Sequence, residues 1–163
     1  MKKIFVLTLL LSIFLFGCEK NMQTPTSKVE EFLSSYQRLD KDVLKELENI
    51  VEKEDEMTEE EKKEYKTLLE KQYQNLAYKI KKEIISKDTA TVDVEIEVLD
   101  YRTAISKSEK ECEKNIIECK LKELKAVNNK TKHDLTITLY QEDGKWVIEN
   151  LNEDDVKKLH GLY

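Results

Sequence analysis

The alternation of apolar and polar residues that starts at Ala90 constrains this fold more than any other feature of the chain. Because successive side chains of a β-strand point to opposite faces, the pattern predicts a strand with one apolar and one wet face. A sheet built on such a strand needs amphipathic helices to cover its apolar face. Five apolar residues define the pattern: Ala90, Val92, Val94, Ile96 and Val98.

Three further segments complete the predicted sheet as two hairpins. The first hairpin turns at Ser86–Asp88, and the second at Asp143-Gly144, a pair that tolerates positive φ and is typical of a tight turn. Trp146 shares one side of its strand with Ile148, and we expect both to face the helices. The additional strand segments are residues 76–80, 135–139 and 146–148.

Helical spacing of apolar residues covers most of the remaining chain. Ser27–Glu30 and Thr58–Glu61 match the capping box that starts a helix, and Asp40 can cap another helix between them. Residues 101–127 also show helical spacing and are predicted to form one long helix. Asn152 is expected to cap a short helical turn near the C-terminus.

These elements predict an α+β fold. The N-terminal helices pack on a curved four-stranded antiparallel sheet, with a long helix between the two hairpins. The chain has 163 residues, which suffices for one packed domain and is too short for two domains of typical size. We therefore expect residues 28–163 to form a single α+β domain.

The first residues carry a different signal. Lys2 and Lys3 precede the run Ile4–Phe16, which is shorter than the roughly 20 apolar residues of a membrane-spanning helix and fits a secretory signal. The run ends in Leu15-Phe16-Gly17-Cys18, which resembles the lipobox of bacterial lipoproteins. The resemblance implies cleavage after Gly17 and a diacylglycerol on the thiol of Cys18.

On this interpretation residues 1–17 are a lipoprotein signal peptide and residues 18–27 a tether. The expected location is the outer face of the bacterial cytoplasmic membrane, because two acyl chains give stable anchoring. The alternatives are a secretory signal without lipid, or an uncleaved anchor with Cys18 as an ordinary cysteine.

The acidic charge is concentrated in the N-terminal half. The chain has 28 basic and 34 acidic residues, a net charge of −6. Between Glu30 and Glu64 there are 14 acids and 6 bases. This balance argues against a nucleic-acid partner and against electrostatic adhesion to anionic lipid, and it leaves a cationic partner open. The acidic residues from Glu52 to Glu61 are interpreted as a solvated loop and a first helical turn.

Two cysteines, Cys112 and Cys119, lie in the predicted long helix. A separation of seven helical residues places their Cα atoms about 10.5 Å apart, beyond the roughly 7 Å that a disulfide tolerates. We therefore expect them to be unbridged to each other and buried as small apolar side chains. A bridge to another chain is the alternative; a metal site has little support, with only His133 and His160 available and no Cys-x-x-Cys.

The order of elements, with the strings Val29–Leu33, Gln74–Tyr78 and Asp143–Ile148, resembles the nuclear-transport-factor-2-like (cystatin-like α+β) superfamily. The similarity is greatest to its small lipoproteins from Gram-positive bacteria and covers about Thr24 to Leu151. It implies a sheet wrapped into a cone around helices, with a cavity inside. The residues that could line this cavity are Tyr65, Tyr78, Tyr101, Tyr140 and Trp146, with Asp100 and His133 as titratable candidates.

No catalytic motif, metal site or cofactor-binding motif accompanies these residues, and the alternative is that the aromatic residues form core while Asp100 and His133 lie on the surface. The expected function is that of a membrane-tethered extracytoplasmic lipoprotein acting as a binding or scaffolding module. Its expected partners are the membrane, through the anchor, and an envelope protein or peptide. The alternatives are a small cavity enzyme of the isomerase or dehydratase type, and a structural protein that self-associates through the long helix.

The first testable prediction concerns the anchor. Mass spectrometry of the N-terminal peptide from membrane-derived protein should find diacylated Cys18 as the first residue. Cys18→Ala should abolish the lipid and release or mislocalise the protein, because the thiol is the acceptor. An unmodified Cys18 inside the mature chain would contradict the prediction.

Overall fold

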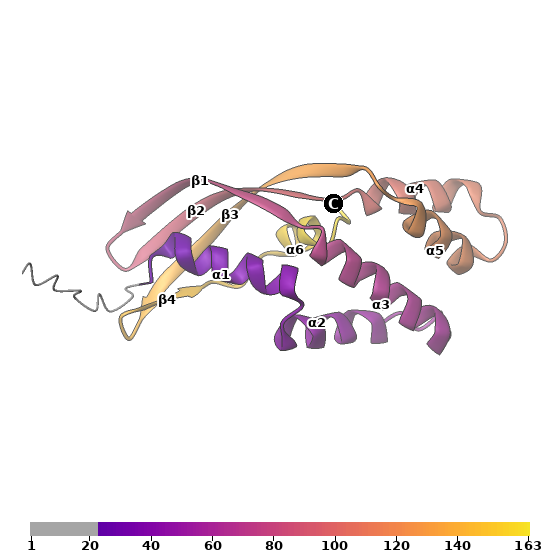
Figure 1. Cartoon of the computed structure of the whole chain (residues 1–163), viewed down its shortest axis with the longest axis horizontal. Helices are drawn as coiled ribbons and strands as arrows, with labels where there is room; N and C mark the ends of the chain where they lie inside the picture. The colour runs from indigo at the N-terminus through magenta and orange to yellow at the C-terminus, as the bar shows by residue number, and fades with distance from the viewer. Residues whose placement is uncertain (1–22) are drawn as a thin grey trace, which may run out of the picture.

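The computed structural model describes residues 23–163, which form six helices and four strands (Figure 1). Along the chain these are α1 (Pro25–Arg38), α2 (Lys41–Glu52), α3 (Glu59–Gln74), β1 (Ala77–Ser86), β2 (Thr89–Leu99), α4 (Tyr101–Glu111), α5 (Ile116–Ala126), β3 (Lys130–Glu142), β4 (Lys145–Ile148) and α6 (Glu153–Leu159). The predicted α+β fold is confirmed. The predicted signal peptide and half of the predicted tether, including Cys18, lie outside the described residues.

The four strands form one antiparallel sheet in the order β1-β2-β3-β4. Its inner face is apolar: the alternating residues of β2, from Ala90 to Val98, are buried. Its outer face is polar, and there Glu95 of β2 pairs with Lys81 at 2.7 Å and with Lys132 at 3.0 Å. The alternation therefore predicted both faces correctly. Among the described strands β1 is at the edge of the sheet next to β2, and it carries an irregularity in register between Ile80 and Lys82.

Helix α1 lies along the inner face of the sheet, where it contacts β1, β2 and β4 (Figure 1). Val29 and Leu33 are fully buried in the core. The helix begins at Pro25, with Thr24 as the N-cap that accepts a hydrogen bond from the Ser27 amide at 3.0 Å. The predicted cap at Ser27 is wrong, because proline at the first helical position already has a helical φ. The folded domain thus begins inside the segment predicted as tether.

The prediction of one helix over residues 101–127 is also wrong. α4 ends at Glu111, and Cys112 has an extended backbone conformation. Asn115 then adopts the left-handed conformation, with φ 53° and ψ 50°, and α5 begins at Ile116. The four residues of the turn let α5 fold back beside α4, and the two helices form a hairpin (Figure 1).

The two ends of the molecule differ in what they carry (Figure 1). The β1–β2 turn, the β3–β4 turn and the start of α1 lie at one end. The α4–α5 hairpin and the loop between α2 and α3 lie at the other. At the first end the Asp143-Gly144 turn has positive φ at both positions, as predicted, and Trp146 beyond it is buried.

The C-terminal segment closes the core at the point where β2 leaves the sheet. Gly161 accepts a hydrogen bond from the Arg102 amide at 2.8 Å and has a φ of 68°. A Cβ at this position would collide with the carbonyl oxygen of Leu99 and the side-chain amide of Gln72. Only glycine fits both the backbone conformation and the space.

Gly161→Ala is expected to destabilise the protein much more than Gly144→Ala. Both glycines have positive φ, but a Cβ at Gly144 meets nothing within 4 Å. Gly144→Ala should lower the free energy of unfolding by about 1 kcal/mol through the backbone conformation alone. Gly161→Ala should cost a further 1–3 kcal/mol, roughly, from the steric overlap. Urea unfolding of the two variants measures the difference, and equal losses would show that the close contact at Gly161 is not present.

Candidate functional site

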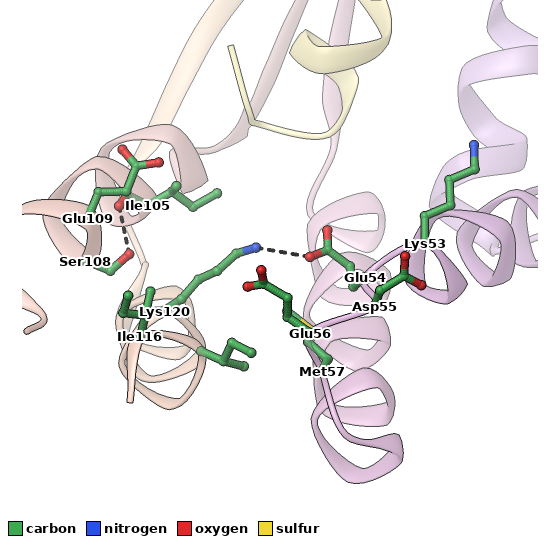
Figure 2. Close-up of a pocket in the computed structure, with 11 residues that line it drawn as sticks. Lys53, Glu54, Asp55, Glu56, Met57, Ile105, Ser108, Glu109, Ile116 and Lys120 are labelled. Carbon is green, nitrogen blue, oxygen red and sulfur yellow. Dashed lines mark hydrogen bonds and ion pairs between the residues drawn. The ribbon is translucent and has the colours of Figure 1, made fainter. Parts of the chain in front are cut away.

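A groove of about 480 Å³ lies at the end of the molecule that carries the α4–α5 hairpin. One wall is the loop between α2 and α3, residues 53–57, and the other is formed by α4 and α5 (Figure 2). Its apolar lining comes from Met57 on the first wall and from Ile105, Ile116 and Ile117 on the second. The groove therefore joins segments that are about 50 residues apart in sequence.

The α2–α3 loop is held from both sides. The amides of Lys53 and Glu54 donate to the last carbonyls of α2. On the other side Thr58 caps α3: its amide donates to the Glu61 carboxylate at 2.8 Å, and its hydroxyl accepts from the Glu61 amide at 3.3 Å. This confirms the predicted capping box. Met57 is buried between these two anchors, which fixes the loop at the edge of the groove.

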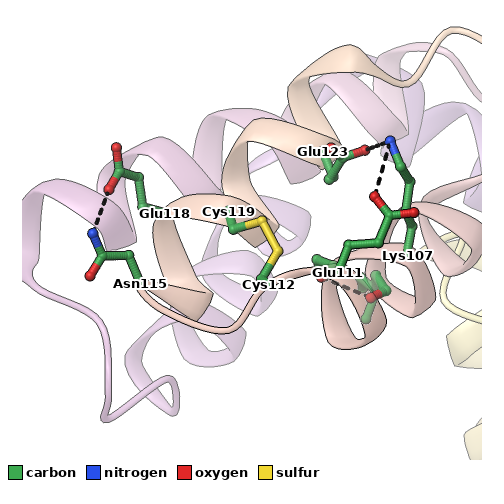
Figure 3. Close-up of a disulfide and its surroundings, with 9 residues drawn as sticks. Lys107, Glu111, Cys112, Asn115, Glu118, Cys119 and Glu123 are labelled. Carbon is green, nitrogen blue, oxygen red and sulfur yellow. Dashed lines mark hydrogen bonds and ion pairs between the residues drawn. A yellow bond between two sulfur atoms is a disulfide. The ribbon is translucent and has the colours of Figure 1, made fainter.

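The second wall is fixed by a disulfide between Cys112 and Cys119 (Figure 3). The expectation that these cysteines are unbridged is wrong, because it assumed an unbroken helix. The turn at residues 112–115 brings their Cα atoms to 6.3 Å, within the range that a disulfide tolerates. The bridge ties the start of α5 to the end of α4. Lys107 adds ion pairs across and along the hairpin, to Glu123 at 2.8 Å and to Glu111 at 4.0 Å.

Lys120 of α5 crosses the groove toward the opposite wall (Figure 2). Its ammonium group lies 3.7 Å from the carboxylate of Glu54 and 5.0 Å from the centre of the Tyr65 ring. Lys125 of the same helix pairs with Glu64 of α3 at 2.7 Å. These contacts set the spacing of the two walls, and the contact with Tyr65 shields part of the Lys120 charge from water.

The rim of the groove is acidic. Its lining residues include four carboxylates, on Glu54, Asp55, Glu56 and Glu109, but only two ammonium groups. One of the latter, on Lys120, already faces Glu54. Ile116 at the mouth is 58% exposed, which is unusual for an isoleucine. An apolar floor with an excess of carboxylates at its rim suits a ligand that combines an aliphatic group with a positive charge.

The aromatic residues predicted to line a cone cavity differ in their burial and in their contacts. Tyr65 and Tyr101 are buried, and the hydroxyl of Tyr101 donates to the Leu68 carbonyl at 2.8 Å. Tyr78 is half-buried on β1, 3.2 Å from the Ser34 hydroxyl, and Tyr140 is exposed on β3. Neither these four nor the buried Trp146 is a lining residue of the groove.

The two titratable candidates, Asp100 and His133, make contacts with neighbouring groups of the fold. Asp100 caps α4, accepting a hydrogen bond from the Thr103 amide at 3.0 Å, and it also accepts one from the Asn129 side chain at 3.1 Å. His133 is partly buried on β3, and its ring stands edge-on to that of Tyr163. Burial and the nearby Lys158 lower the pKa of His133, so its neutral form is favoured.

A buried polar cluster between α1, α2, α3 and the end of α6 was not predicted from the sequence. The hydroxyl of Tyr73 lies 2.7 Å from Nε2 of His160, which is itself 3.7 Å from Glu46. The hydroxyl of Tyr36 donates to the same carboxylate at 3.0 Å. The contact with His160 is the main cause that lowers the pKa of Glu46, and burial raises the pKa of Tyr73. No residue of this cluster lines the groove, and its contacts join α6 to the helices.

Comparison with known protein families, curated proteins and solved structures finds no match to this chain. The resemblance to the nuclear-transport-factor-2-like superfamily therefore stays a prediction. Within residues 23–163, no helix combines the length and the apolar character needed to cross a bilayer. In the same part of the chain, no three His, Cys, Asp or Glu side chains converge on a point that could hold a metal ion.

The disulfide leads to a prediction about the stability of the α4–α5 hairpin. Alkylation of the unfolded, non-reduced protein should leave Cys112 and Cys119 unlabelled, and peptide mapping should recover them linked. The double variant Cys112→Ser/Cys119→Ser should lose about 2 kcal/mol of unfolding free energy, because the bridge limits the unfolded chain. A reductant should bring the parent protein to the stability of the double variant and leave the variant itself unchanged. Alkylation of both thiols without reduction would contradict the assignment.

Proposed function

We propose that this chain is a lipid-anchored extracytoplasmic binding module whose groove takes a short segment of a partner protein. The observation that carries the proposal is the groove itself, which has an apolar floor, an acidic rim and two braced walls. It lies at the end of the molecule opposite the start of α1 (Figure 1). A chain anchored through its N-terminus would therefore present the groove away from the membrane.

The disulfide supports the proposed location. Structural disulfides form and persist in oxidising compartments, including the outer side of the bacterial cytoplasmic membrane, and are rare in the cytosol. A bridge between Cys112 and Cys119 therefore agrees with the export that the signal-like N-terminus predicts. It also stiffens the wall that carries Ile116, which reduces the entropy lost when a ligand binds.

The chemistry of the groove defines the ligand class. The four carboxylates at the rim favour a lysine or arginine side chain, and the exposed Ile116 offers an apolar contact beside them. A volume of about 480 Å³ suits a few side chains rather than a whole folded surface. We propose a peptide segment that carries an aliphatic residue next to a basic one, held by apolar burial and oriented by charge.

The predicted titratable candidates and the Tyr73–His160–Glu46 cluster do not support the enzymatic alternative at the groove. A general acid or base must reach its substrate within hydrogen-bond distance. The Tyr73–His160–Glu46 cluster belongs to the contacts between helices, and neither it nor Asp100 or His133 lines the groove.

The proposal predicts a sequence preference among displayed peptides. Selection of a random peptide library on the purified protein should enrich peptides with a lysine or arginine beside Leu, Ile or Met. Ile116→Asp should weaken the binding of the enriched peptides about tenfold or more, because it removes the apolar contact at the mouth of the groove. Glu56→Lys should weaken it as well, by reversing a charge at the rim.

Ile84→Asp is the matched control for Ile116→Asp. Ile84 is also exposed, at 48%, but lies at the other end of the molecule, so its replacement should leave peptide binding unchanged. Enriched peptides that bind Ile116→Asp as well as the parent protein would contradict the groove as the binding site. Concentration-dependent dimerisation that Ile116→Asp abolishes, with no peptide enriched, would instead favour self-association.

A further inference from the structure

The end of the sheet opposite the groove exposes a second set of apolar side chains. Five large hydrophobic or aromatic residues are exposed in residues 23–163, and three of them lie here: Ile84 is 48% exposed, Ile85 54% and Tyr140 41%. Ile84 and Ile85 are in β1 just before the β1–β2 turn, and Tyr140 is in β3 near the β3–β4 turn. Exposed apolar residues gathered at one place mark a contact surface.

The register of the sheet shows what kind of surface this is. Ile85 pairs with Ala90, which is buried, so Ile85 lies on the inner face of the sheet, beyond the cover of α1. Ile84 pairs with Thr91 and lies on the outer face, as does Tyr140, which pairs with Thr89. The apolar groups therefore project from both faces of the tip. A protein docking flat on the sheet would meet only one face, whereas a lipid surface met end-on contacts both.

The start of the domain is fixed to the same tip. The amide and the hydroxyl of Thr26, at the beginning of α1, both donate to Oε2 of Glu83, at 2.8 and 2.7 Å. Glu83 precedes Ile84 in β1. The chain thus enters the folded domain beside the exposed isoleucines, which places any N-terminal anchor near them.

The length of the tether limits how far the tip can lie from the bilayer. This step rests on the proposed anchor at Cys18, from which six residues, 19–24, lead to Pro25. Seven peptide units span about 25 Å at most when fully extended. The start of α1 therefore lies within about 25 Å of the anchored residue, and the α4–α5 hairpin that forms one wall of the groove lies at the other end of the domain (Figure 1).

The charges of the two ends favour the same orientation. Residues 79–88 and 140–145 of the tip together contain five lysines and four acids, whereas residues 52–61 beside the groove contain seven acids and one lysine. The negative surface of a bilayer therefore repels the groove end much more strongly than the tip. The overall acidity of the chain argues against a membrane-binding face in general, but its acidic stretch lies at the groove end.

We propose that the tip formed by Ile84, Ile85 and Tyr140 rests on the outer leaflet of the bilayer that carries the anchor, with the sheet standing end-on. Tyrosine suits the boundary between headgroups and acyl chains, and the two isoleucines reach the upper acyl region. The contact holds the groove away from the membrane and gives the anchored protein one orientation instead of free rotation about its tether.

Fluorescence quenching by brominated lipids tests this orientation. Full-length lipidated protein is placed in vesicles of phosphatidylglycerol and phosphatidylcholine, with or without bromine on the acyl chains. The variants Ile84→Trp and Ile85→Trp add a tryptophan on either face of the tip, and Ile116→Trp adds one at the groove. The fluorescence of Trp146, measured in the parent protein, is subtracted first. The brominated lipids should then reduce the fluorescence of each tip tryptophan about twofold, because the acyl boundary lies within about 10 Å of the surface. The groove tryptophan should be unaffected.

The outcomes separate this inference from the proposed anchor. Protein that fails to float with the vesicles lacks the anchor, and the inference fails with it. Protein that floats but shows unquenched tip tryptophans, or equal quenching at Ile116→Trp, keeps the anchor and overturns the end-on contact. Near-parent thermal unfolding of each variant shows that the substitution at an exposed site left the fold intact. In the parent, vesicles should protect the β1–β2 turn against proteolysis. The double variant Ile84→Glu/Ile85→Glu should float normally with the vesicles but lose this protection.

Discussion

The buried side-chain amide of Gln72 is the contact on which the arrangement of the other elements depends. Its oxygen accepts a hydrogen bond from the Leu99 amide at 2.9 Å, and its nitrogen donates to the Leu99 carbonyl at 3.4 Å. One side chain of α3 therefore satisfies both backbone groups of the last residue of β2, where unpaired groups would be costly. Because α4 starts two residues later, this contact also sets where α4, and so one wall of the groove, leaves the sheet.

The parts of the fold that were predictable from the sequence are those set by local chemistry or by burial on one face. The strand at 89–99 follows from its period of two, since its inner residues are buried and its outer ones are not. The start of α3 follows from the reciprocal bonds of Thr58 and Glu61, and the β3–β4 turn follows from two residues that tolerate positive φ. Each of these signals lies within a few residues of the structure that it specifies.

The groove could not be predicted because it depends on a break in the helix and on contacts between distant segments. Ser108 and Leu121 are both buried, although thirteen positions, about 3.6 turns, would place them on opposite sides of a continuous helix. Because serine is polar, the sequence pattern does not mark Ser108 as buried. The change in the buried face between α4 and α5 is therefore not visible in the pattern of apolar residues. The left-handed backbone conformation of Asn115 separates the two helices, and this turn brings Cys112 and Cys119 close enough to bond. Met57 and Ile116 line the same groove from segments far apart in sequence, and no local pattern signals this.

The irregular register of β1 has a consequence if the chain is anchored to a membrane as proposed. Chains held in one plane meet at high local concentration and in similar orientations, the conditions under which exposed strand edges pair between molecules. Within residues 23–163 one edge of β1 pairs with no other strand, and the irregularity between Ile80 and Lys82 interrupts the hydrogen-bonding pattern of β1 in a lysine-rich stretch. Bulges and lysines on edge strands oppose such pairing. Crowding on a membrane would then bring neighbouring copies together without joining their sheets.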